Sequence, residues 1–242
     1  MNGHPFIAHV HVPKTAGTAI DGALQTALGP GRHHVEGIIE ENATFVGVVN
    51  NSNWISGHVP EPKLRAEIAK VGRKAHFVTA LREPFAHVAS HYNWLIEIGH
   101  RGDAFLHGHP PAIIEIHERI KTSDNTDPDV IIRNLHMNPR LFLNCQSMYV
   151  LGTGAPSTVA SLSASLDRYD GLVFSDDIKG GLSAAIPNIE FDPKEKNASP
   201  YHFDRDIFGD PKLVRYLEEK NASDLALWNF ANDNYRERNG VT

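Results

Sequence analysis

Residues 11–20 combine a lysine, two threonines and a glycine in a pattern typical of an oxyanion-binding loop. They read His-Val-Pro-Lys-Thr-Ala-Gly-Thr-Ala-Ile. Alternating apolar residues at 6–12 predict a strand before them, and apolar spacing at 18–28 predicts a helix after them. The N–H groups and positive end of that helix would face the anion, and Lys14 would add a full charge. The loop is not a Walker A motif, because Lys14 precedes Gly17 instead of following it.

A second anion-binding pattern begins at Arg82. Residues 75–81 form a short apolar run that predicts a buried strand, and Pro84 suits the first turn of a helix predicted over 84–98. Arg82 stands at the end of the strand and Ser90 lies two turns into the helix. Both side chains could therefore reach one phosphate at the carboxyl edge of the sheet. The structural alternative is that Arg82 caps a carbonyl and Ser90 is an ordinary helix serine.

These two patterns, in this order, resemble the two cofactor motifs of sulfotransferases. The first resembles the 5′-phosphosulfate loop of the carbohydrate branch, and the second resembles the 3′-phosphate motif. The resemblance implies a P-loop-like fold that binds 3′-phosphoadenosine 5′-phosphosulfate (PAPS). It implies that Arg82 and Ser90 hold the 3′-phosphate. It assigns the 5′-phosphosulfate to the loop, with the backbone N–H groups of residues 15–19 and the two threonine hydroxyls as donors. The loop residues are Pro13, Lys14, Thr15, Ala16, Gly17, Thr18 and Ala19.

Three smaller segments are similar to the same branch, at residues 144–152, 169–176 and 196–200. In relatives the last of these lies near the nucleotide, which implies that Asn197 and Ser199 contact the cofactor. Two positions depart from the family pattern. His87 stands where relatives commonly have arginine, and the glutamate of the turn after the 169–176 segment is absent.

The resemblance also suggests the catalytic residues. Gly57-His58-Val59 lies between the two motifs, where the uronyl and heparan sulfate 2-O-sulfotransferases have the same tripeptide and use its histidine as the base. Histidine suits proton abstraction because its unperturbed pKa is near neutrality. Lys14 would stabilise the charge that develops on the leaving phosphate. Glu61 and Glu83 remain alternative bases, because other branches of the family use a carboxylate.

His87 and His91 are four residues apart on a predicted helix face, which is the spacing of a metal-binding pair. No third ligand lies at a matching spacing. The sequence therefore favours packing or surface roles for both, and it predicts an enzyme without a metal. Sulfonate transfer from PAPS needs none, since lysine and the helix dipole supply the positive charge.

The composition fits a single domain over residues 1–242. The chain has 41% hydrophobic residues, enough for a core, and its net charge of −6 argues against non-specific nucleic-acid binding. Its one cysteine excludes an internal disulfide and fits a reducing compartment. No signal peptide or membrane-spanning run is visible. The sequence therefore predicts a soluble, cytoplasmic, bacterial-type family member.

Strands alternating with helices predict an α/β fold with a mainly parallel sheet and helices on both faces. Ligands of such sheets bind at the carboxyl ends of the strands, where both motifs lie. Residues 99–111 predict a loop. Further strands are predicted at 44–49, 54–56 and 171–175, and further helices at 62–71, 112–121, 127–135, 158–167, 178–185, 211–220 and 222–238.

The resemblance favours a sulfotransferase acting on a glycan or other hydroxyl-bearing small acceptor, and three alternatives remain. A P-loop-type small-molecule kinase lacks a recognisable Walker A motif and a strand ending in a Mg-binding aspartate. A sulfotransferase for a lipid or secondary metabolite is also compatible, because the acceptor walls come from loops that no motif marks. A non-catalytic nucleotide-binding protein would not need both Lys14 and His58.

Overall fold

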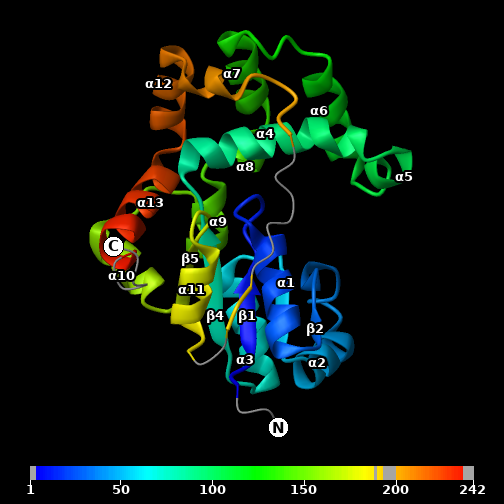
Figure 1. The fold of residues 1–242 in the computed structure, drawn as a ribbon, viewed down its shortest axis with the longest axis vertical. Coiled ribbons are helices and arrows are strands. Elements are labelled where there is room, and N and C mark those ends of the chain that lie inside the picture. Colours follow the sequence, from blue (N-terminus) through cyan, green and yellow to red (C-terminus); the bar gives the residue numbers. More distant parts are fainter. Residues whose placement is uncertain (1–3, 188–189, 193–199, 237–242) are drawn as a thin grey trace.

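The computed structural model describes residues 4–187, 190–192 and 200–236, and their centre is a five-stranded parallel sheet (Figure 1). The strand order is β2-β3-β1-β4-β5. The strands are β1 (Ile7–Val10), β2 (Gly31–Arg32), β3 (Trp54–Gly57), β4 (His76–Leu81) and β5 (Gly171–Phe174). The longer helices are α1 (Gly17–Leu28), α2 (Asn42–Asn51), α3 (Glu61–Val71), α4 (Pro84–His100), α6 (Pro111–Lys121), α7 (Pro128–Met137), α12 (Pro211–Lys220) and α13 (Ala222–Tyr235). The shorter ones are η1 (Val35–Gly37), α5 (Asp103–Leu106), α8 (Pro139–Phe142), α9 (Cys145–Leu151), α10 (Val159–Leu166), α11 (Ile178–Ala185) and η2 (Arg205–Gly209).

Strand β1 marks the point where the strand order reverses. It pairs with β3 on one side and with β4 on the other, so Val10 lies between Gly57 and Thr79. After β1, the chain forms β2 and β3 on one side of it. The next two strands, β4 and β5, lie on its other side. Ligands of open parallel sheets bind beside such a reversal, at the carboxyl ends of the strands. The carboxyl end of β1 is therefore the expected position of a site.

Alternate strand residues enter two separate cores, and this confirms the prediction of helices on both faces. Ile7, Val78 and Val173 pack with α1 and α11 on one face. Their sequence neighbours Ala8 and Phe77 pack on the other face, with α2, α3, α10 and α13. Because the four longer strands are covered on both sides, most of their residues are apolar, as is usual for parallel sheets.

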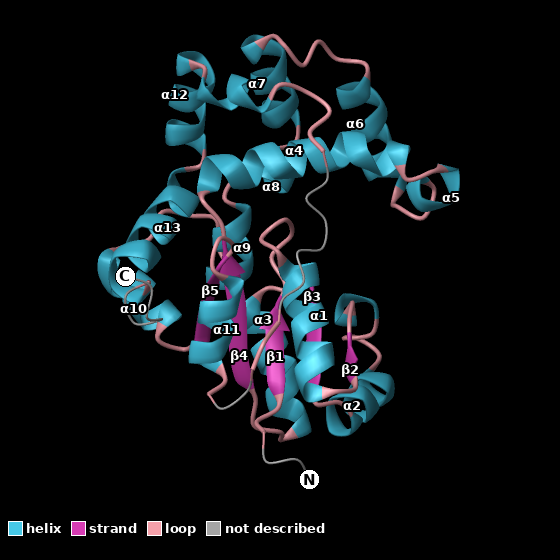
Figure 2. Cartoon of the chain, in the orientation of Figure 1, coloured by secondary structure: helices cyan, strands magenta, loops and turns pink. Residues whose placement is uncertain are grey.

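A third core lies beyond the carboxyl ends of the strands. Helix α4 crosses this end of the sheet and packs against α6, while α7 and α12 pack against each other in the same core (Figure 2). Its buried residues include Val88, Leu95, Ile131 and Leu213. The helical layer therefore faces the edge of the sheet at which both anion-binding patterns end.

Most predicted elements are confirmed, including the helix after Pro84 and the strand ending at Leu81, but one is wrong. Residues 44–49 were expected to form a strand and instead belong to helix α2. Only Phe45 and Val49 of that helix are buried. They lie one turn apart, so one narrow apolar face of the helix packs against the core. Short apolar runs rich in valine fit either element, and here packing decides. The loop predicted at 99–111 contains the short helix α5.

Among the described residues, none of the helices is both long enough and apolar enough to cross a membrane.

Candidate functional site

The loop between β1 and α1 has the backbone geometry of an anion site. Lys14 and Ala16 both adopt left-handed backbone conformations, with φ of 64° and 71°, and α1 starts at Gly17 without a side-chain cap or an acidic residue in its first turn. The N–H groups of residues 15–18 donate to no other described residue. Uncapped N–H groups at a positive helix end attract an anion. The loop therefore presents N–H groups without a partner in the described part of the chain, as an anion site requires.

Two loop residues differ in detail from their predicted roles. The Thr15 hydroxyl is buried and donates to the Val12 carbonyl over 2.9 Å, so it braces the loop from within. The N–H of Ala19 donates to the carbonyl of Ala16. Thr18 is exposed at the start of α1. The Thr15 hydroxyl and the Ala19 N–H group are thus already used within the protein, whereas the hydroxyl and N–H group of Thr18 have no partner among the described residues.

Lys14 brings a partly buried ammonium to the loop. Burial, followed by the charges of Arg101 and Arg82, lowers the pKa of Lys14 to about 8, against the opposing charge of Glu97. A lysine whose charge is disfavoured by its surroundings gains from an anionic ligand, and such groups gather at functional sites.

Arg82 joins the two anion-binding patterns. Its Nη1 donates to the Lys14 carbonyl over 3.2 Å, although the two residues are 68 positions apart in the chain. The side-chain amide of the buried Gln146 forms two hydrogen bonds with the backbone of Arg82. It accepts from the N–H and donates to the carbonyl, both over 2.9 Å. Gln146 lies in the 144–152 segment, whose role in the site the sequence did not specify. Gln146 therefore fixes the backbone of Arg82, while the guanidinium caps the Lys14 carbonyl at the loop, a contact that the structural alternative also predicted.

The remaining predicted phosphate contacts are partly visible. Ser90 is half-buried in the second turn of α4, and the structure shows no contact between it and Arg82. Asn197 and Ser199 lie outside the described residues.

His58 follows β3 and is held in one tautomer. Its Nδ1 lies 2.8 Å from the carbonyl oxygen of His11, which can only accept, so Nδ1 carries the hydrogen. In the neutral ring Nε2 is therefore the lone-pair nitrogen. Burial, together with the charge of His11, lowers the pKa of His58. A neutral imidazole with a fixed lone pair is the form that a general base needs.

The two carboxylates considered as alternative bases are both held in structural contacts. Glu61 is fully buried and forms ion pairs with Arg65 and Arg168. Glu83 caps α4, where its carboxylate accepts from the N–H groups of Phe85 and Ala86. Both carboxylates are therefore engaged in contacts within the protein.

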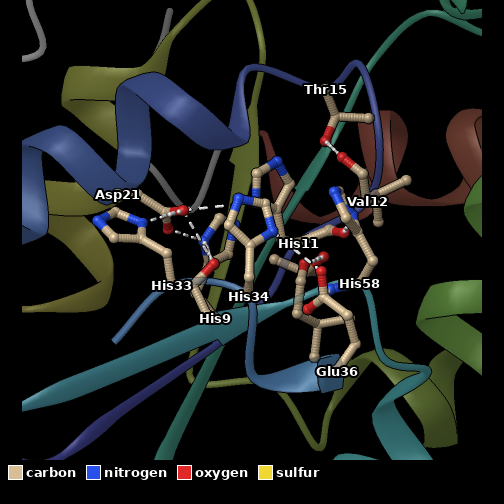
Figure 3. A network of polar contacts seen from close by, with 12 residues as sticks. His9, His11, Val12, Thr15, Asp21, His33, His34, Glu36 and His58 are labelled. Atoms are coloured by element: carbon tan, nitrogen blue, oxygen red, sulfur yellow. Dashed lines mark hydrogen bonds and ion pairs between the residues drawn. The ribbon is translucent and has the colours of Figure 1, made fainter. Parts of the chain in front are cut away.

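A buried aspartate with three histidines around it was not predicted (Figure 3). Asp21 Oδ1 lies 2.7 Å from His9 Nδ1, and Asp21 Oδ2 lies 3.1 Å from His33 Nδ1 and 3.4 Å from His11 Nδ1. Ser56 also donates to Asp21. Burial alone would raise the pKa of Asp21, but His9, His11 and His33 lower it well below its usual range. The carboxylate therefore stays ionised and orients the histidines.

The imidazole of His11 connects Asp21 to the loop and to His58. Its ring centre is 4.4 Å from that of His58 (Figure 3), and its Nε2 lies close to the α-carbon of Gly17. A Cβ atom on Gly17 would be 2.1 Å from that nitrogen. Glycine at the start of α1 is therefore required by the ring that backs His58.

We expect Gly17→Ala to lower the free energy of unfolding by about 1–3 kcal/mol, because the new methyl group must displace the His11 ring. Gly22→Ala in the same helix is the matched control. Nothing lies within 4 Å of its added methyl group, and it should raise stability by about 0.5–1 kcal/mol. Urea unfolding of the two variants measures both values. Equal effects would show that the His11 ring does not need this space.

Comparison with known protein families and with curated proteins gives no match for this chain.

Proposed function

We propose that this protein is a sulfotransferase that moves a sulfonate group from PAPS to a hydroxyl of a carbohydrate-like acceptor. The observation that carries the proposal is the contact between Arg82 and the Lys14 carbonyl. Through it the guanidinium of the second motif reaches the loop of the first, at the carboxyl end of the central strand. A donor that carries one phosphate for each motif fits two neighbouring anion-binding segments.

In the proposed reaction the acceptor hydroxyl attacks sulfur as Nε2 of His58 takes its proton. The bond between sulfur and the bridging oxygen breaks, and its electron pair stays on the phosphate of 3′,5′-bisphosphoadenosine. Lys14 stabilises that developing charge, which is larger in the transition state than in the bound donor. The free N–H groups of residues 15–18 hold the 5′ end of the donor.

Nucleotide binding tests the proposal directly. We expect 3′,5′-bisphosphoadenosine to raise the melting temperature clearly more than AMP or ATP, because only it offers both phosphates to the two motifs. At a concentration one hundred times its dissociation constant it should add about 2.7 kcal/mol of stability. An equal or larger shift with ATP and Mg²⁺ would contradict the proposal and favour a kinase. Transfer of labelled sulfonate from PAPS to a panel of glycans, lipids and small alcohols then identifies the acceptor.

Arg82→Ala should weaken binding of 3′,5′-bisphosphoadenosine by about 10- to 100-fold. The reason is the loss of a charge-assisted contact worth about 1.5–3 kcal/mol. The fold should persist, because Gln146 binds the backbone of residue 82 and not its side chain. Calorimetric titration measures the affinity, with Arg133→Ala on the exposed surface of α7 as the control. An unfolded Arg82→Ala variant, or one with normal affinity, would make Arg82 a structural residue.

A further inference from the structure

Three buried residues meet beneath the phosphosulfate loop, and the proposed transfer reaction uses none of them. They are His87 and His91 on α4 and Cys145 at the start of α9. One ring nitrogen from each histidine and the sulfur of Cys145 all lie within 4.8 Å of one another. The sequence showed the histidine pair, but Cys145 is more than fifty positions away in the chain, and only the fold brings it to them.

The contacts of His87 leave a lone pair facing this cluster. Its Nε2 lies 2.8 Å from the Pro13 carbonyl oxygen, which can only accept, so Nε2 carries the hydrogen. Nδ1 is then the lone-pair nitrogen, and it is buried without a partner among the described residues. A metal-binding histidine is commonly held in this way, with its second nitrogen donating to a carbonyl group.

Among the described residues, His91 also lacks a partner that buried polar atoms normally have, and Cys145 forms no disulfide. Nδ1 of His91 is buried and meets no hydrogen-bonding group of the described chain. Its ring lies against Trp94 and Phe142. Cys145 is buried as a free thiol. Two orphaned imidazole nitrogens and one thiol in the same interior space are costly unless something binds them.

We propose that His87, His91 and Cys145 form a binding site for a transition-metal ion, Zn²⁺ in the first instance. Two imidazoles and a thiolate are the ligands that Zn²⁺ selects, and its ligand distances of about 2.0–2.3 Å would draw the three atoms together by about 1 Å. The thiol loses its proton when the metal binds, so one positive charge remains at the site. The site is separate from the base and the donor loop, but His87 ties it to the loop through Pro13.

Cobalt substitution gives a direct test, because the chain has a single cysteine. The full-length protein is first stripped with a chelator under reducing conditions and then titrated with Co²⁺. We expect a thiolate-to-cobalt charge-transfer band that saturates at one equivalent and disappears when Zn²⁺ is added. Any such band must come from Cys145. No band, or a band that never saturates, would overturn the proposal.

Variants separate this site from the other histidine cluster. Cys145→Ser should abolish the band, and His87→Gln or His91→Gln should each weaken Co²⁺ binding at least about tenfold. His33→Gln, which removes a histidine from the Asp21 cluster, should leave the band and the affinity unchanged. Unchanged affinity in both α4 variants would overturn the assignment.

One readout needs no substitution. In the intact protein, Zn²⁺ should raise the melting temperature and slow alkylation of the thiol at least about tenfold, as expected when a metal occupies the sulfur. Unchanged alkylation in saturating Zn²⁺ would overturn the proposal. These measurements do not depend on sulfotransferase activity, so they can fail while the proposed function holds.

Discussion

His58→Ala should lower the turnover number by about 100-fold or more, the usual contribution of a positioned general base. The variant loses the Nε2 lone pair of His58, whose tautomer is fixed by the contact of Nδ1 with the His11 carbonyl. Affinity for 3′,5′-bisphosphoadenosine should change little, because the proposed partner of His58 is the acceptor hydroxyl and not the nucleotide. Steady-state kinetics with a verified acceptor, together with nucleotide titration, measures the two quantities separately.

A neighbouring histidine provides the control for this experiment. The ring centre of His34 is 5.9 Å from that of His58, but His34 is exposed and forms a hydrogen bond with Glu36. Asparagine tolerates the left-handed backbone conformation of residue 34, so His34→Asn should keep most of the activity. Full activity in His58→Ala, with activity lost in Glu83→Gln, would instead make a carboxylate the base.

The pH profile gives His58 a second signature. A base works only when unprotonated, so the rate should fall as the pH drops through the pKa of His58. Burial lowers that pKa, so the acid limb should lie below the pH expected for a free histidine. The limb should be absent from whatever activity His58→Ala retains.

The fold was largely predictable because its elements have strong local signals. Residues 75–81 and the helix after Pro84 carry an apolar run and a helix-start signal, and both elements form as expected. Residues 44–49 carry only a short valine-rich run, which a strand and a one-sided helix share. Strand β2 has two residues, too few for a pattern of any period.

The sequence carries a signal for the Asp21 cluster. Asp21 is the single charged residue in the sequence of α1; His9 in β1 and His11 just after it are two residues apart, so both can face the same side in an extended chain. A lone acid in an uncharged helix after such a pair predicts a buried contact between them. Gln146 and Cys145 lie in the 144–152 segment that resembles the family, but nothing in that segment predicted contacts with Arg82 or His87, because only tertiary packing brings them together.

Lys14→Met should lower the turnover number by about 100- to 1,000-fold, which is the usual loss when one group that stabilises transition-state charge is removed. Methionine keeps the apolar stem and removes the ammonium. The turnover number should fall by a larger factor than the affinity for the donor, because the charge on the bridging oxygen develops during transfer. Lys63→Met, at an exposed ion pair with Glu40, is the control and should keep full activity.

The alkaline side of the pH profile identifies Lys14 by its unusual pKa. Lys14 works only when protonated, so kcat/KM, which reports the free enzyme, should fall as the pH rises through about 8. Bound donor raises this pKa by adding negative charge, so the limb in kcat should lie at higher pH. Lys14→Arg stays charged throughout this range and should lack the limb, even if its turnover is low. If the limb near pH 8 persists in Lys14→Arg, or if Lys14→Met loses donor affinity and turnover by the same factor, Lys14 binds the donor and does not stabilise the leaving phosphate.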